Sequence, residues 1–258
     1  MSAKVTLSDL GFMDLLKAFI AWTIILLAVT LIVNYAVLAS PYAAKVIQED
    51  PLRAARDFAE FFVTVVNPSA HQSAFTKIVN IFGISPSFFF VLSAIVDAIL
   101  FTIFGLALLA SLRLWFGVRT IWKGHRSILS LATLVGASLS LIGSVLALIG
   151  LILLLTTDVT PVVNQGMALT LSSSSIYMAL PFPWPMTMGT LLWILGIGIV
   201  GILLLIFLVR DGDFLGIAFM AILIIGSILS IIGMLLIGFI LMSIASGLIV
   251  LTRRGVAI

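Results

Sequence analysis

The residue with the clearest chemical potential is a single acid in an apolar run. Asp97 lies in the stretch 91–103, VLSAIVDAILFTI, where every other residue suits a membrane helix. An ionised aspartate at the centre of such a helix costs roughly 2.5–3.5 kcal/mol even on the most lenient insertion scale. Asp97 is therefore expected to be protonated, to face water, or to hydrogen-bond to another polar side chain.

Two polar side chains are the expected partners of Asp97. Asn34 falls at a similar depth in the first apolar segment, and Ser93 precedes Asp97 by one helical turn on the same face. With such a partner, Asp97 is a structural group in an interhelical hydrogen bond worth about 0.6–2 kcal/mol. As a titrating group, it is typical of a proton- or cation-coupled carrier. Both interpretations of this candidate intramembrane polar site stay open.

The other motifs that resemble catalytic or cofactor sites lack the residues that such sites require. Residues 196–201, GIGIVG, match a dinucleotide-binding pattern but lie inside an apolar helix, not at a strand-to-helix turn. Residues 211–213, Asp-Gly-Asp, resemble a metal-binding pair without a third acid nearby. Two histidines outside the spans and no cysteine leave no set of ligands for zinc or haem. We therefore expect no enzyme activity, no cofactor and no metal site.

The composition assigns the chain to the multi-span membrane class. Hydrophobic residues make up 62% of the 258 and charged residues only 9%, against about 25% charged residues in soluble domains. Such a chain cannot cover a water-soluble globule with polar side chains. The lack of cysteine, together with only four Asn and three Gln, favours a thermophilic source.

The apolar segments predict an all-α polytopic transmembrane bundle that forms one integral membrane domain. Five segments reach the roughly 20 residues that cross a hydrocarbon core: 15–39, 88–112, 127–156, 187–209 and 215–251. The last one is long enough for an over-long single span or for a hairpin that turns near Gly233. We favour the single span, because no polar turn signal marks its middle. The prediction is five spans, or six with the hairpin.

Residues 40–87, between the first two spans, are predicted to lie outside the membrane as amphipathic helices. Asp50-Pro51 is a good helix start, and apolar residues follow it at helical spacing. A second amphipathic run extends from Ala74 to Phe82 and closes at Gly83. Such helices rest on the membrane interface or on neighbouring spans.

The distribution of basic residues sets the expected orientation in the cell membrane. Residues 157–186 contain no Lys or Arg, whereas 113–126 contain no acid and four cations: Arg113, Arg119, Lys123 and Arg126. The positive-inside rule places the 113–126 loop, and with it the N-terminus, in the cytoplasm. Interleaved with two tryptophans, these cations form a candidate docking patch for anionic lipid headgroups, a cytoplasmic partner or nucleic acid. No motif supports nucleic acid specifically.

Small residues at helical spacing predict where the spans touch one another. The pattern Gly-x3-Ser-x2-Gly occurs in LVGASLSLIGSVL (134–146) and again in IIGSILSIIGMLL (224–236). Small side chains let helix backbones approach closely, which is how helices associate in lipid. The expected packing residues are Gly136, Ser140, Gly143 and Gly150 in the first seam and Gly226, Ser230 and Gly233 in the second.

This layout resembles two groups of archaeal membrane proteins. The likeness lies in the span plan, the amphipathic 40–87 segment, the Trp/Arg-rich 113–126 loop and the glycine seams. One group is rich in glycine heptads and uncharacterised. The other comprises the channel-like polytopic components of the crenarchaeal DNA-import machinery, which is similar to conjugative secretion systems.

The resemblance implies a non-enzymatic subunit of a translocation or channel-like assembly. Its partners would be membrane lipids and either other membrane subunits or further copies of this chain. No functional residue is carried over from the resemblance, because no diagnostic motif accompanies it. The alternative is a small secondary transporter, a proton- or cation-coupled carrier that uses Asp97.

Overall fold

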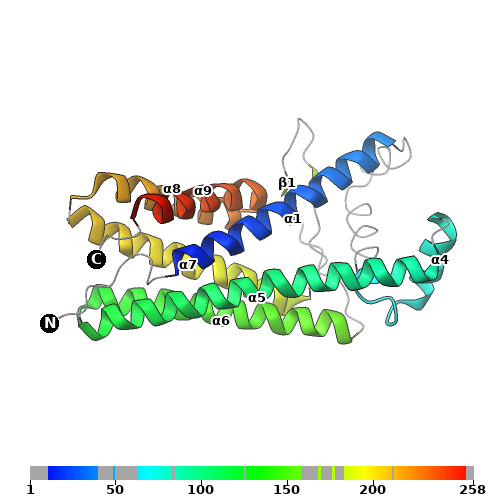
Figure 1. The fold of residues 1–258 in the computed structure, drawn as a ribbon, viewed down its shortest axis with the longest axis horizontal. Coiled ribbons are helices and arrows are strands. Elements are labelled where there is room, and N and C mark those ends of the chain that lie inside the picture. Colours follow the sequence, from blue (N-terminus) through cyan, green and yellow to red (C-terminus); the bar gives the residue numbers. More distant parts are fainter. Residues whose placement is uncertain are drawn as a thin grey trace.

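The computed structural model describes residues 11–39, 49, 63–82, 85–124, 126–157, 168–169, 176–177, 183–210 and 212–253. Its helices are α1 (Phe12–Ala39), α4 (Gln72–Phe82), α5 (Pro86–Gly124), α6 (Ile128–Thr156), α7 (Trp184–Arg210), α8 (Phe214–Ile231) and α9 (Leu235–Arg253). A short antiparallel pair of strands, β1 (Ala168–Leu169) and β2 (Ile176–Tyr177), follows α6. The long helices lie side by side in one elongated bundle (Figure 1).

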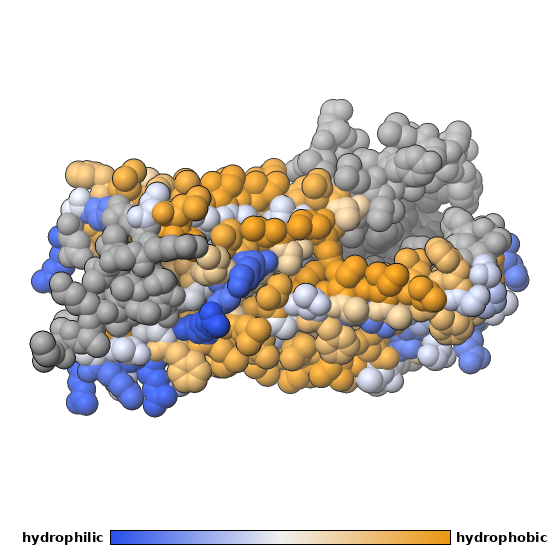
Figure 2. All heavy atoms as spheres, viewed as in Figure 1, coloured by the Kyte–Doolittle hydropathy of each residue, from blue (hydrophilic) through white to orange (hydrophobic). Residues whose placement is uncertain are grey.

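The bundle is that of a multi-pass integral membrane protein, and the predicted all-α class is confirmed. Five of the described helices, α5 to α9, are long and apolar enough to cross a membrane. α1 has 28 residues and packs against α9 and α5. Large apolar side chains cover much of the outer surface between the two ends of the bundle, as contact with lipid requires (Figure 2).

The segment 215–251 is a helical hairpin, so the preference for a single span was wrong. α8 ends at Ile231, and the backbone N–H of Met234 donates to the Leu229 carbonyl at 2.9 Å. Gly233 sits between them with a φ of 101°, a conformation that glycine enters without strain. The turn needs no polar residue because this glycine closes it. Each arm, at 18–19 residues, is about 27 Å long, close to the ~30 Å hydrocarbon core.

The hairpin predicts the side of the membrane on which α9 ends. In this cysteine-free chain, a cysteine at Arg253 should react with an impermeant thiol reagent from the same side as one at Lys123, because α9 returns to the end where α5 stops. A cysteine at Ser87, at the opposite end of α5, is the control and should react from the other side. Labelling of positions 253 and 87 from one side would contradict the hairpin.

α5 extends well beyond its predicted span, and residues 113–124 are helix and not loop. Leu114, Val118 and Ile121 are buried at helical spacing, which explains why the helix continues to Gly124. α6 then begins almost at once, since the Ser127 side chain accepts from the Ser130 backbone N–H as its N-cap. We call the end of the bundle that holds the α5–α6 and α7–α8 connections the basic end, since Lys123, Arg126 and Arg210 lie there.

Among the described helices, α6 and α7 make the most extensive contact, and small residues let their backbones approach closely. A methyl group added at Gly143 would lie 2.6 Å from the Gly189 carbonyl oxygen and closer still to the Trp193 backbone nitrogen. Gly150 meets Met186 in the same way, and Gly196 meets the backbone of Ser140. The two backbones are therefore in direct contact along this seam.

The other glycines place α7 and α9 against α8. In the GIGIVG stretch, Gly198 faces Ser227 of α8 and Gly201 faces Leu223, so this stretch packs helices together. Gly226 lies against Gly238 of α9, near Ser230. Gly136 completes the α6 seam against the Ile199 side chain. Gly233, expected in the second seam, lies instead in the α8–α9 turn.

The amphipathic run predicted from Ala74 to Phe82 forms α4, two residues longer at its start. Its Phe75 ring packs against Phe89 and Phe90 at the beginning of α5, with ring centroids 5.0 and 5.5 Å apart. α4 therefore covers the end of α5 opposite the basic end (Figure 1). The helix predicted to start at Asp50-Pro51 falls outside the described residues, apart from the helical residues 63–66.

Candidate functional site

Asp97 lies on α5, and one of its two predicted hydrogen-bond partners, Ser93, does not bind it. Its side chain is half-buried, and among the described residues its buried Oδ1 atom has no hydrogen-bond partner. Ser93 is buried one turn away, but the structure forms no hydrogen bond between the two. The Asn34 side chain falls outside the described residues, so that predicted partner stays a prediction.

The register of α5 against α6 places Asp97 near the rim of the bundle and not at its centre. Ser111 Oγ of α5 and Ser140 Oγ of α6 lie 3.2 Å apart and fix the two antiparallel helices relative to each other. Asp97 precedes Ser111 by as many residues as Leu154 follows Ser140, so Asp97 is level with Leu154 in the last turn of α6. α5 continues beyond this level, past the end of α6 (Figure 1).

A polar side chain from outside the bundle occupies the same level. Asn67 is buried, and its Nδ2 atom donates to the Leu154 carbonyl at 3.2 Å and to the Thr157 carbonyl at 3.4 Å. Its Oδ1 accepts from the Ala70 backbone N–H at 3.2 Å. Asn67 thus satisfies carbonyl groups that the end of α6 would otherwise leave unpaired.

Removing the Asp97 carboxylate should not weaken the fold. We expect Asp97→Leu to leave the stability unchanged or to raise it by about 1 kcal/mol, because an unpaired carboxylate on a largely apolar helix is unfavourable. The control Asp97→Asn should lie within ~0.5 kcal/mol of the natural protein. Thermal unfolding in detergent measures both. A loss above ~2 kcal/mol in Asp97→Leu would show that Asp97 has a hydrogen-bond partner after all.

A second charged group, which the sequence did not reveal, joins α1 to α5. Asp14 lies in the first turn of α1, with its side chain only 10% exposed. The Arg113 Nη1 atom lies 2.6 Å from Asp14 Oδ2, and Lys17 Nζ lies 3.6 Å from Oδ1. Arg113, predicted to be part of a cytoplasmic loop, therefore holds the start of α1 against α5.

This ion pair lies at the side of the bundle, well away from the basic end along the bundle axis. The Trp115 indole N–H donates to Ser138 Oγ at 3.1 Å, which sets Arg113 about a third of the way along α6 from the basic end. Ser138 is about 15 Å from the start of α6 at 1.5 Å per residue. α1 accordingly begins well inside the bundle, away from the basic end (Figure 1). Hydrophilic side chains cross the apolar surface there as a diagonal band (Figure 2).

Three of the four predicted docking cations share the exposed face of α5. Arg113, Arg119 and Lys123 are exposed, and they follow one another along the last third of the helix, with the exposed Phe116 between the first two. The Arg119 guanidinium lies 5.1 Å from the ring centroid of Trp115, a cation–π contact. Arg126 is also exposed but lies beyond the end of α5. We call Arg113, Arg119 and Lys123 the basic face of α5.

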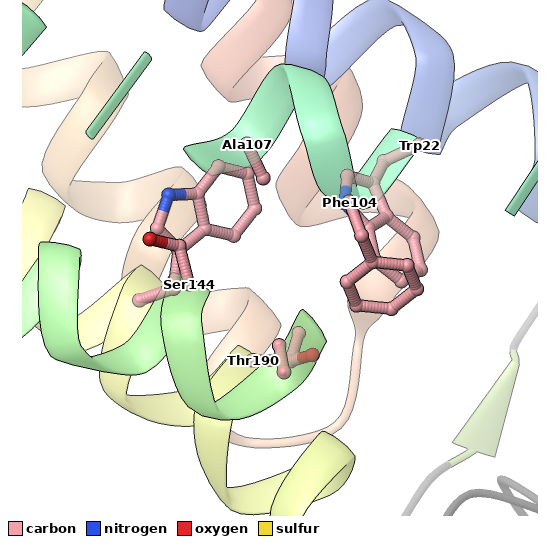
Figure 3. A pocket seen from close by; sticks show the side chains of 7 residues that line it. Trp22, Phe104, Ala107, Ser144 and Thr190 are labelled. Carbon is pink, nitrogen blue, oxygen red and sulfur yellow. The ribbon is translucent and has the colours of Figure 1, made fainter. Parts of the chain in front are cut away.

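The interior of the bundle is filled by aromatic rings. Trp22 stacks on Phe239 with centroids 5.5 Å apart, and its edge meets Phe104 at 5.3 Å. Phe19 contacts Trp193 at 5.6 Å in the same cluster. A small void beside these rings is too narrow for a water molecule, and Figure 3 shows side chains of four helices closing around it. This site offers no room for a substrate.

The motifs that resembled metal or cofactor sites have structural roles where the structure describes them. Asp213 caps α8, since its Oδ1 accepts from the Gly216 backbone N–H at 3.2 Å. Asp211 lies outside the described residues. Within the described part of the chain, no three His, Asp or Glu side chains gather as metal ligands would.

Comparison with known proteins identified no relative of this chain. No family model matches the chain, and no curated protein or solved structure shows significant similarity to it. The geometry therefore leaves two candidate functional features of this membrane protein, which are Asp97 at one rim and the charged group on α1 and α5.

Proposed function

We propose that the protein is a non-enzymatic subunit of a membrane translocation or channel-like assembly. The observation that carries the proposal is a contrast among the described residues, between helices packed closely inside the bundle and cations exposed on its outer surface. The α6–α7 backbones touch, aromatic rings fill the space beside them, and the void among these rings admits no water. The basic face of α5 and Asp97 lie on the outside or at the rim. A path for a translocated molecule would then form between subunits.

We further propose that the basic end faces the cytoplasm. The hairpin supports this orientation because it changes the side of the membrane on which the arginines after the last helix lie. With 215–251 as a single span, the arginines at 253 and 254 would lie outside, whereas with the hairpin α9 ends on the side where α5 ends. Lys123, Arg126 and Arg210 then share the cytoplasmic side with them, as the positive-inside rule favours. The N-terminus lies on the same side.

The carrier remains the second candidate, and one observation favours it. Asp97 has a buried oxygen atom without a hydrogen-bond partner in the described part of the structure, as a proton- or cation-binding carboxylate could have. Its level near the end of α6 argues against the role, because secondary transporters bind their substrates near the bilayer midplane.

Flux measurements on the protein alone separate the two candidates. Reconstituted by itself in sealed vesicles, a subunit of an assembly should show no proton- or sodium-coupled flux above that of empty vesicles. Flux that Asp97→Asn abolishes while the fold stays intact would establish the carrier, because an amide cannot titrate in this range.

A further inference from the structure

The cations around the start of α1 outnumber the acids that could neutralise them. Lys17 and the basic face of α5 supply four positive charges, and Asp14 is the one acid in contact with any of them among the described residues. Arg113 and Lys17 contact Asp14 yet keep 66% and 57% of their side chains exposed. Most of this positive charge therefore faces outward from the bundle.

These cations lie at a depth where the neighbouring helices expose apolar side chains. On α6, Val135 and Leu131 are about half exposed, and they lie between the level of Arg113 and the basic end. On α5 itself, Leu109 and Phe116 are each 55% exposed on either side of Arg113. Such side chains are the surface that a bilayer covers. The cations thus start at the basic end and extend into the zone of lipid contact.

α1 does not cover the part of the basic face between Arg113 and the basic end, because α1 begins beside Arg113. Gly11 precedes α1 and lies directly against Arg113, so that a methyl group at Gly11 would be 2.8 Å from the Arg113 Cβ atom. From that point α1 runs away from the basic end (Figure 1). Its Trp22 ring contacts Phe104 of α5. Arg119 and Lys123 therefore lie beyond the reach of α1, on a face that α1 leaves uncovered.

We propose that the basic face of α5, together with Lys17, binds the phosphate headgroup of an anionic phospholipid from the leaflet at the basic end. A guanidinium offers two parallel N–H donors to phosphate oxygens, and an ammonium adds a compact positive charge. Arg119 and Lys123 meet the headgroup first, and Arg113 and Lys17 are the cations farthest from the basic end. Phe116 and Trp115 contact the acyl chains or the glycerol region, as aromatic side chains do at membrane interfaces.

The setting favours a lipid over the other polyanions that could bind cations. A nucleic acid or an acidic protein needs a water-exposed surface around its charges, whereas the surroundings of Arg113 are apolar and lipid-facing. A phospholipid in the bilayer places its phosphate next to these cations and its acyl chains next to the apolar side chains beside them. A soluble polyanion has no apolar part to cover these side chains. The inference does not depend on the proposed role in translocation.

The test compares the retention of anionic and neutral lipid by charge variants. The full-length protein is placed in nanodiscs of phosphatidylcholine mixed with phosphatidylglycerol, and the immobilised fraction of each spin-labelled lipid is measured. We expect the protein to prefer phosphatidylglycerol, and Arg119→Gln with Lys123→Gln to reduce this preference by about fivefold for each cation removed. The matched control is Arg126→Gln with Arg210→Gln, which removes the same charge from the same end but leaves the basic face intact. The control should keep the preference.

Three outcomes would overturn the site. They are no preference in the natural protein, an unchanged preference in the Arg119/Lys123 variant, and an equal loss in the control, which would mean a diffuse surface charge. Inorganic phosphate distinguishes a lipid from a soluble anion. If it displaces the spin-labelled lipid at millimolar concentration and binds the detergent-solubilised protein with the same sensitivity to Arg119→Gln, the occupant is a free anion and not a lipid. Native-like unfolding temperatures in all variants show that folding is intact.

Discussion

Replacing Gly143 by leucine should prevent α6 and α7 from packing, so that little or no folded protein is recovered. The α6 backbone at Gly143 touches the α7 backbone at Gly189 and Trp193, and a leucine side chain has no space between them. Overpacking a core with extra methylenes already costs about 1–3 kcal/mol where side chains can adjust. Here the obstacle is backbone, which cannot rotate away, so the two helices must separate.

Two glycine-to-alanine substitutions, which add only a methyl group, measure the cost of filling the α6–α7 contact. Gly143→Ala should lower the free energy of unfolding by at least about 2 kcal/mol, because the added methyl group meets the Trp193 backbone nitrogen and the Gly189 carbonyl. Gly105→Ala is the matched control, since Gly105 has no atom of a neighbouring element within 4 Å. The control should be neutral or stabilising by up to about 1 kcal/mol, since alanine is the better helix former.

Thermal unfolding of both alanine variants in the same detergent provides the comparison. Equal unfolding temperatures for Gly143→Ala and Gly105→Ala would contradict the close α6–α7 contact. A normal yield of folded Gly143→Leu protein would do so as well.

Breaking the ion pair between α1 and α5 should give the second large effect. Arg113→Gln leaves the Asp14 carboxylate, which is 10% exposed, with only the more distant Lys17 to compensate it. Removing one partner of a fully buried pair costs about 3–5 kcal/mol. Because Arg113 is two-thirds exposed and Lys17 remains, we expect a loss of about 2 kcal/mol.

A double-mutant cycle isolates the pair from the other effects of each change. Asp14→Asn combined with Arg113→Gln should be less destabilising than the sum of the two single variants, because the second change removes a charge that the first left unpaired. Lys123→Gln, an exposed cation on the same face, should stay within ~0.5 kcal/mol of the natural protein. Additive effects of Asp14→Asn and Arg113→Gln would show that the two side chains do not interact.

The sequence predicted the membrane class and a seam of small residues on 127–156, because both depend on local patterns; it did not predict which helix this seam contacts. Apolar segments of spanning length appear directly as hydropathy, and a seam of small residues marks where a backbone can approach another. The hairpin at Gly233 was missed because its turn contains no polar residue, and only its positive φ distinguishes it from a packing glycine. The helical continuation of α5 was missed because the charges of 113–126 concealed a buried stripe.

The candidate site was predicted less well, because it depends on how the helices are shifted along one another. The sequence analysis selected Asp97 as the unusual acid of its apolar run, but its level near the rim follows from the Ser111–Ser140 contact, which the sequence does not contain. The ion pair of Asp14 with Arg113 joins residues just outside two predicted spans on the same predicted side of the membrane. The sequence does not show that α1 packs against α5 or which of their faces meet, and the pair depends on both.

The central claim is that this bundle acts through its surfaces as part of an assembly. Its most direct test is purification from the native membrane without crosslinking, followed by native mass spectrometry of what remains bound. The account predicts a defined complex, either with other membrane proteins in fixed ratio or with further copies of this chain. The account would be contradicted if the protein is purified as a monomer with no other protein bound, and if this monomer by itself catalyses coupled transport that requires Asp97.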